Sequence, residues 1–81
     1  MIKCDLHGFR LFEAIEEILD VLEDCLSSGD KNLFIIHGYR NGQVLKNYVR
    51  SKKFIQDMAS EGYILKEVNL PNPGASMFKV I

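Results

Sequence analysis

Near the middle of the chain lies the stretch Leu33-Phe34-Ile35-Ile36-His37-Gly38, an apolar run that ends in a His-Gly pair. Four consecutive apolar residues are typical of a central strand that is covered on at least one face. A second His-Gly pair, in Asp5-Leu6-His7-Gly8, follows the strand-like residues 1–4. If the two runs form neighbouring parallel strands, their carboxyl ends share one sheet edge, where open α/β sheets hold their sites. We therefore expect both imidazoles to lie side by side there, next to two helix N-termini.

The segments around these runs predict the rest of the fold. Residues 11–27 and 44–61 carry apolar side chains at helical spacing, and the spacing leaves open whether the second helix breaks near Ser51. Strand-like runs follow at 63–70 and 77–81, separated by a loop with two prolines and a glycine. The order β-α-β-α-β-β predicts an α/β fold of the two-layer α+β sandwich type, with two helices on a mixed four-stranded sheet.

Length and composition bound the class of protein. Residues 1–81 suffice for a single domain with one small core, and 47% apolar with 26% charged residues is typical of globular chains. No run approaches the ~18 apolar residues of a membrane span, and no signal-peptide pattern follows Met1. We therefore expect a cytoplasmic protein without a membrane partner. Cys4 and Cys25 fall on a predicted strand and on an apolar helix stripe, which favours structural thiols.

The charges are segregated, although the net charge is only −1. Residues 11–30 hold seven acids and no base, whereas residues 31–56 hold six bases and no acid. We interpret the acidic run as the solvated face of the first helix. The basic run predicts a local patch that can meet phosphates.

The residues that flank the His-Gly pairs suit a phosphodiester ligand. A glycine after each histidine permits close approach of a ligand, and the first-turn amides of a following helix attract anions. Arg10 and Arg40 can each form paired hydrogen bonds with a phosphate, and Tyr39 can stack on a base.

Asp5 stands two residues before His7, so both share one face of an extended strand. The carboxylate could then orient the imidazole and raise its basicity, as a general acid or base requires. Alternatively, Asp5 caps the first helix or pairs with Arg10, and His7 binds a carbonyl; the residues leave this open. Asp5, His7 and His37 could also hold a divalent metal, but no metal-ligand spacing supports such a site, and we assign no cofactor.

Three motifs, in this order, resemble the signatures of the Smr (small MutS-related) domain family. Asp5-Leu6-His7-Gly8 resembles the first signature, Ile35-Ile36-His37-Gly38 with Gly42 the second, and Pro73-Gly74-Ala75-Ser76 the third. Arg10 stands where the family's first signature is followed by a Ser or Thr helix cap. The resemblance implies a fold similar to the C-terminal domain of translation initiation factor 3. It also implies binding of DNA or RNA, with an endonuclease activity that nicks DNA or cleaves RNA.

The residues and the resemblance together assign roles at the site. Catalysis is assigned to Asp5, His7 and His37. The expected contacts to DNA or RNA are Gly8, Arg10, Gly38, Tyr39, Arg40, Gly42, Lys46, Arg50 and Gly74.

Two other functions fit the same sequence. One is a non-catalytic DNA- or RNA-binding module that forms part of a larger MutS-type protein. The other is a protein-interaction domain whose acidic helix meets a basic partner, with both histidines structural.

Overall fold

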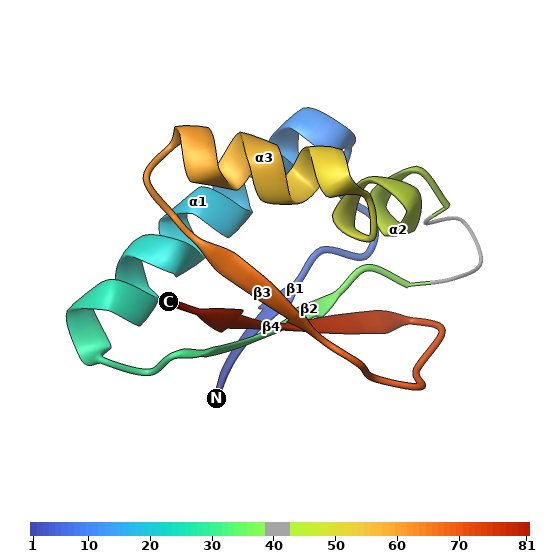
Figure 1. Cartoon of the computed structure of the whole chain (residues 1–81). Helices are drawn as coiled ribbons and strands as arrows, with labels where there is room; N and C mark the ends of the chain where they lie inside the picture. The colour runs from blue at the N-terminus through green and yellow to red at the C-terminus, as the bar shows by residue number, and fades with distance from the viewer. Residues whose placement is uncertain (39–42) are drawn as a thin grey trace.

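A four-stranded sheet with helices on one side forms the structure, a computed structural model that describes residues 1–38 and 43–81 (Figure 1). The strands are β1 (Ile2–Asp5), β2 (Asn32–Ile36), β3 (Leu65–Val68) and β4 (Ala75–Val80). The helices are α1 (Leu11–Ser28), α2 (Gln43–Val49) and α3 (Lys52–Ser60). None of the helices in the described residues is long and apolar enough to cross a bilayer.

The strand order β1-β2-β4-β3 places the carboxyl ends of three strands at one edge. β1 pairs with β2 in parallel, and β4 runs antiparallel to both β2 and β3. β3 therefore runs in the same direction as β1 and β2, so the loop that leaves it lies beside both His-Gly pairs. The backbone N–H groups of His37 and Gly38 donate to the carbonyl of Gly74 in that loop, at 3.0 and 2.9 Å. The predicted mixed four-stranded sheet is confirmed.

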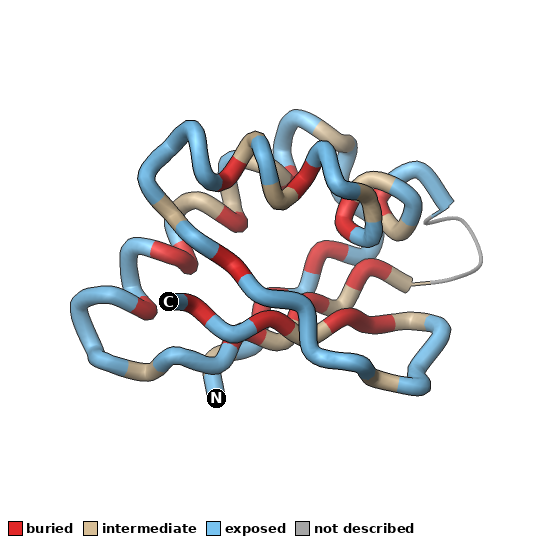
Figure 2. The backbone as a smooth tube through the Cα atoms, viewed as in Figure 1, coloured by how far each residue is buried: buried red, intermediate tan, exposed pale blue. Residues whose placement is uncertain are grey.

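The core lies between the sheet and the helices, and none of the helices in residues 1–38 and 43–81 covers the other face of the sheet. Leu33 and Ile35 of β2 and Phe78 of β4 point toward the helices and are fully buried. The ring of Phe54 on α3 meets that of Phe78 edge-on, with 5.2 Å between centroids. Figure 2 shows the buried stretches of the strands and helices turned toward one another. The molecule therefore has two layers, as predicted.

Both cysteines are buried, free thiols in this core. Burial raises the pKa of the Cys4 thiol to about 12, and burial also raises the pKa of Cys25. Neither thiol is ionised near neutral pH, which agrees with structural roles.

The second predicted helix is two helices, α2 and α3, so the described residues form three helices where two were expected. The hydroxyl of Ser51 donates to the carbonyl of Tyr48 at 2.6 Å and accepts from the N–H of Phe54 at 3.3 Å. Serine competes with the helix backbone in this way and favours a helix start. The break turns the chain between the half-buried Tyr48 and the buried Phe54, so both rings pack together.

Replacing Ser51 by alanine should lower the free energy of unfolding by about 1 kcal/mol, because the first turn of α3 loses its cap. Urea denaturation measures this as a lower midpoint with an unchanged slope. Ser51→Asn retains a capping oxygen and should stay close to the wild type. Equal losses in both variants would contradict the capping role.

Candidate functional site

Asp5 and His7 form an exposed pair on the uncovered side of the sheet. His7 Nδ1 lies 2.6 Å from Asp5 Oδ1, and the backbone N–H of His7 donates to the same oxygen at 3.2 Å. The side chains are 75% (His7) and 52% (Asp5) exposed, so a ligand can reach both. Hydrogen bonds from His7 hold the pKa of Asp5 below its usual value. Because an ionised carboxylate only accepts, Nδ1 donates to it, and the neutral ring keeps Nε2 as its proton acceptor.

The helix cap that the sequence left open is supplied by Glu13. The backbone N–H of Arg10 donates to Glu13 Oε1 at 2.9 Å, so Asp5 is not needed there. Gly8 has a φ of +83°, a conformation that a residue with a side chain rarely adopts. The carboxylate of Glu13 already lies at the N-terminus of α1. A phosphate expected at this helix end would have to compete with that charge.

His37 is fully buried, and both of its ring nitrogens have partners. Nδ1 lies 2.8 Å from the Gly38 carbonyl and Nε2 lies 3.0 Å from Ser76 Oγ. Burial lowers the pKa of His37, and the charge of Arg50 lowers it further. The neutral ring therefore donates from Nδ1 to the carbonyl and accepts at Nε2 from the Ser76 hydroxyl.

The two imidazoles lie on opposite faces of the sheet, so the expectation that they stand side by side is wrong. A Cβ atom placed on Gly38 would lie 3.8 Å from the Cβ of His7, which puts Gly38 on His7's face and His37 on the other. His37 follows the buried residue Ile35 by two positions, whereas His7 follows the exposed Asp5 by two. Each histidine thus continues the alternation of buried and exposed residues in its own strand.

Arg50, an expected nucleic-acid contact, also forms hydrogen bonds within the domain. Its Nη2 donates to the carbonyls of Asn72 and Ala75 at 2.6 and 2.9 Å, and its Nε donates to Ser76 Oγ at 3.0 Å. Arg50 therefore ties the end of α2 to the loop before β4. Sequence reasoning missed Asn72 and Ser76, although Ser76 lies in the buried phase of β4, where a polar residue needs a partner.

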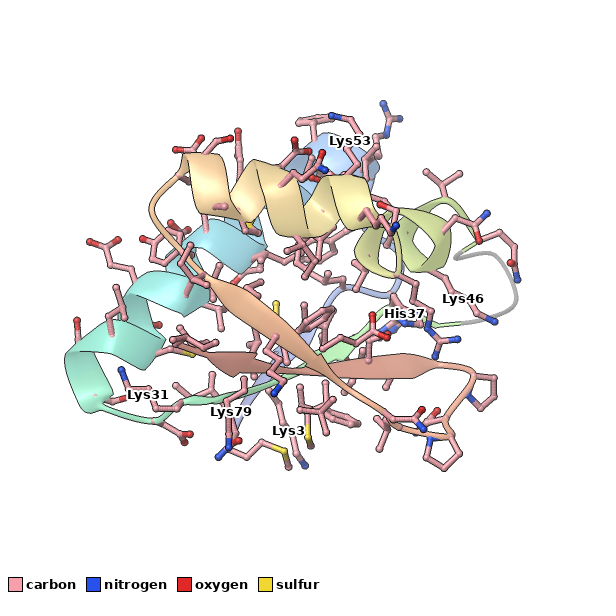
Figure 3. The ribbon with its side chains drawn as sticks, viewed as in Figure 1. Lys3, Lys31, His37, Lys46, Lys53 and Lys79 are labelled. Carbon is pink, nitrogen blue, oxygen red and sulfur yellow. The ribbon has the colours of Figure 1, made fainter. Side chains whose placement is uncertain are left out.

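A shallow depression of about 390 Å³ opens beside His7 on the uncovered face. It collects three of the predicted site residues, His7, Gly38 and Gly74, over an apolar floor. Its lining residues are His7, Phe34, Ile36, Gly38, Asn72, Gly74 and Ala75. Lys46, on α2, lies close enough to His37 for its charge to lower the pKa of that ring (Figure 3). The remaining predicted contacts, Tyr39, Arg40 and Gly42, lie outside the described residues.

Comparison with known proteins covers the first two motifs, and residues 73–76 lie outside the family match. The family model of the Smr domain matches residues 4–65. The chain belongs to the Smr domain family. This Smr domain is 36% identical over 64 residues to a protein named endonuclease MutS2 from Finegoldia magna. The match covers 75% of this chain but 8% of that relative, so the chain spans less than a tenth of its length. No solved structure gave a significant match.

The Smr domain does not form the three-ligand metal site that the sequence left open. Asp5 and His7 lie on one face of the sheet and His37 is buried on the other. Within residues 1–38 and 43–81, no three side chains of His, Cys, Asp or Glu are grouped so that they could hold a metal ion.

The stability of the Smr domain should fall as the pH drops below 6.5, the ordinary pKa of histidine. The unfolded chain then protonates His37, whereas burial keeps the folded ring neutral down to its lower pKa. Chemical denaturation between pH about 7.5 and about 5 measures this loss. His37→Gln should remove most of this pH dependence, and His7→Gln, which keeps the buried ring, should retain it. The same pH dependence in His37→Gln and the wild type would assign the effect to another group.

Proposed function

We propose that this Smr domain cleaves a phosphodiester bond of DNA or RNA. His7 transfers a proton in this reaction, and Asp5 orients the imidazole ring of His7. The observation that carries the proposal is the exposed imidazole of His7, whose Nδ1 lies 2.6 Å from Asp5 beside an open depression. The name of the relative, endonuclease MutS2, supports the same reaction class.

The tautomer of His7 defines its chemical role. Because Nδ1 donates to Asp5, Nε2 can take a proton from an attacking water, or from a 2′-hydroxyl where the substrate is RNA. The oxygen then attacks phosphorus, the bond from phosphorus to the leaving oxygen breaks, and that oxygen takes up a proton from water, while the imidazolium of His7 later returns its proton to the solvent. Asp5 stabilises the imidazolium that forms during the transfer.

Side chains, not strand-end amides, supply the binding charge for the phosphate. The N–H groups of His37 and Gly38 already donate to the Gly74 carbonyl, so they do not point at a ligand. Arg10 is exposed beside the first motif and Lys46 is half-buried on α2, and we assign them the phosphate contacts. Gly38 and Gly74 leave space for the substrate because they carry no side chain. His37 positions the end of β2 through Ser76 and does not exchange protons with the substrate.

The second candidate is a DNA- or RNA-binding module that does not cleave. The burial of His37 favours it, since one exposed imidazole remains where the sequence suggested two. Both candidates predict binding, and cleavage distinguishes them.

The His7→Ala variant should reduce cleavage by about 100-fold or more, because general acid-base catalysis is lost. Nicking of supercoiled plasmid and cleavage of end-labelled RNA, with and without chelator, measure the rate. Affinity for the uncleaved substrate should change little. Asp5→Asn should also slow cleavage, whereas Asp20→Asn on the outer face of α1 serves as the matched control and should not. Cleavage at the wild-type rate by His7→Ala would refute the proposal.

Binding should weaken steeply as salt rises, whether or not the domain cleaves. If about four phosphates are neutralised, the logarithm of affinity should fall against the logarithm of salt with a slope of about −3.6 on duplex DNA and about −2.8 on a single strand. Fluorescence anisotropy at several salt concentrations measures the slope. Affinity that does not depend on salt would argue against a nucleic-acid ligand.

A further inference from the structure

The uncovered face of the sheet carries a row of side chains that crosses all four strands and is apolar on β2, β4 and β3. The pairing registers place Lys3 beside Phe34, Phe34 beside Met77, and Met77 beside Val68. Phe34 and Met77 are half-buried, and Val68 is 37% exposed. Phe34 also lines the depression that contains His7. The row is therefore continuous with the candidate site.

Three lysines lie in this row or beside it. Lys66 and Lys79 stand directly opposite each other in the β3–β4 pair, and Lys3 begins the row on β1. Figure 3 shows Lys3 and Lys79 on the side of the sheet away from the helices. Like charges directly opposite each other in a sheet are destabilising, so this pair indicates a surface adapted to an anion.

In the part of the chain that the structure describes, no salt bridge joins these lysines to an acid. The salt bridges within residues 1–38 and 43–81 join the N-terminus to Asp30, His7 to Asp5, and Lys53 to Asp57. None of these pairs contains Lys3, Lys66 or Lys79. On the strand positions of the uncovered face, the acid is Asp5, which is already bound to His7. The charge of this face is thus complementary to a polyanion.

We propose that a single strand of DNA or RNA lies across this uncovered face, with a base stacked on Phe34 and phosphates beside Lys79, Lys66 and Lys3. The inference rests on the proposed function, since it names the form of nucleic acid that reaches His7. Aromatic and apolar side chains at the centre of a basic surface contact the faces of unpaired bases, which a duplex keeps stacked inside. From Gly38 to Asn32 the surface extends about 20 Å along β2, enough for several nucleotides.

A second copy of the chain fits this face less well. A two-fold dimer would bring the same patch against itself, so the lysines of one copy would face those of the other. The charges therefore favour a nucleic-acid strand, and self-association becomes an outcome that the experiment can detect.

The test measures binding by fluorescence anisotropy with fluorescein-labelled oligothymidylate, oligouridylate and a duplex of matched length, each about 12 nucleotides. Phe34→Leu keeps an apolar side chain but removes the ring, and should weaken single-strand binding about fivefold or more. Phe12→Leu is the matched control, because Phe12 is 62% exposed on α1, and should bind like the wild type. Circular dichroism verifies that both variants fold.

A second part of the test measures the contribution of the lysines and does not depend on Phe34. Lys79→Gln should reduce the magnitude of the salt slope on a single strand by about 0.7, one phosphate contact. Gln56→Glu, an exposed position on α3, changes the net charge equally and should leave the slope unchanged. The two oligonucleotide arms show whether DNA or RNA binds more tightly.

The inference is supported if single strands bind more tightly than the duplex and Phe34→Leu loses this preference. If the domain does not cleave, this binding result still supports the inference, and only the proposed hydrolysis fails. Unchanged single-strand binding in both Phe34→Leu and Lys79→Gln overturns the inference, whether or not cleavage persists. A concentration-dependent dimer in sedimentation that Phe34→Leu dissolves, without an effect on oligonucleotides, also overturns it.

Discussion

Alternation along β-strands, combined with helices on only one side of the sheet, determines what each residue of this Smr domain can do. Successive side chains of a strand point to opposite faces, so every strand residue is either under the helices or on the open side. His7 falls in the open phase of β1 and is exposed, whereas His37 falls in the covered phase of β2 and is buried. Two identical His-Gly pairs are thus placed in different environments, one exposed and one buried.

The covered histidine has a structural use that matches its chemistry. His37, Ser76 and Arg50 form a chain of hydrogen bonds in which the serine hydroxyl donates to the imidazole and accepts from the guanidinium. Every described buried polar side-chain atom has a partner, which is the condition under which buried polar groups stabilise a unique arrangement. The chain joins β2, β4 and the end of α2 at the edge that holds His7. Arg50 also donates to the carbonyls of Asn72 and Ala75, two residues that line the depression, so the same chain holds part of its lining in place.

The sequence predicted the order of the elements along the chain and the long amphipathic helix, and it offered the Asp5–His7 pair as one of two alternatives, because each of these depends on residues close together in the chain. The face of His37 was also available in principle, since Leu33, Ile35 and His37 share one phase. Arg50 could not be assigned in the same way. Its partners lie 22 to 26 residues further along, and only the packed loop brings their oxygens within its reach. Long-range pairing of this kind leaves no periodic signal.

The charge distribution gives the molecule a preferred side for a polyanion. The outward residues of α1 are acidic, among them Glu16, Asp20 and Glu23, and they lie in the helical layer. Lys3, Lys66 and Lys79 lie on the opposite side of the sheet, outside the basic run that the sequence pattern singled out. A net charge of −1 therefore conceals an acidic surface on α1 and a basic surface on the open face of the sheet. Under the proposed function, we expect a phosphate chain to be repelled from α1 and attracted to the open sheet, toward the face where His7 is exposed.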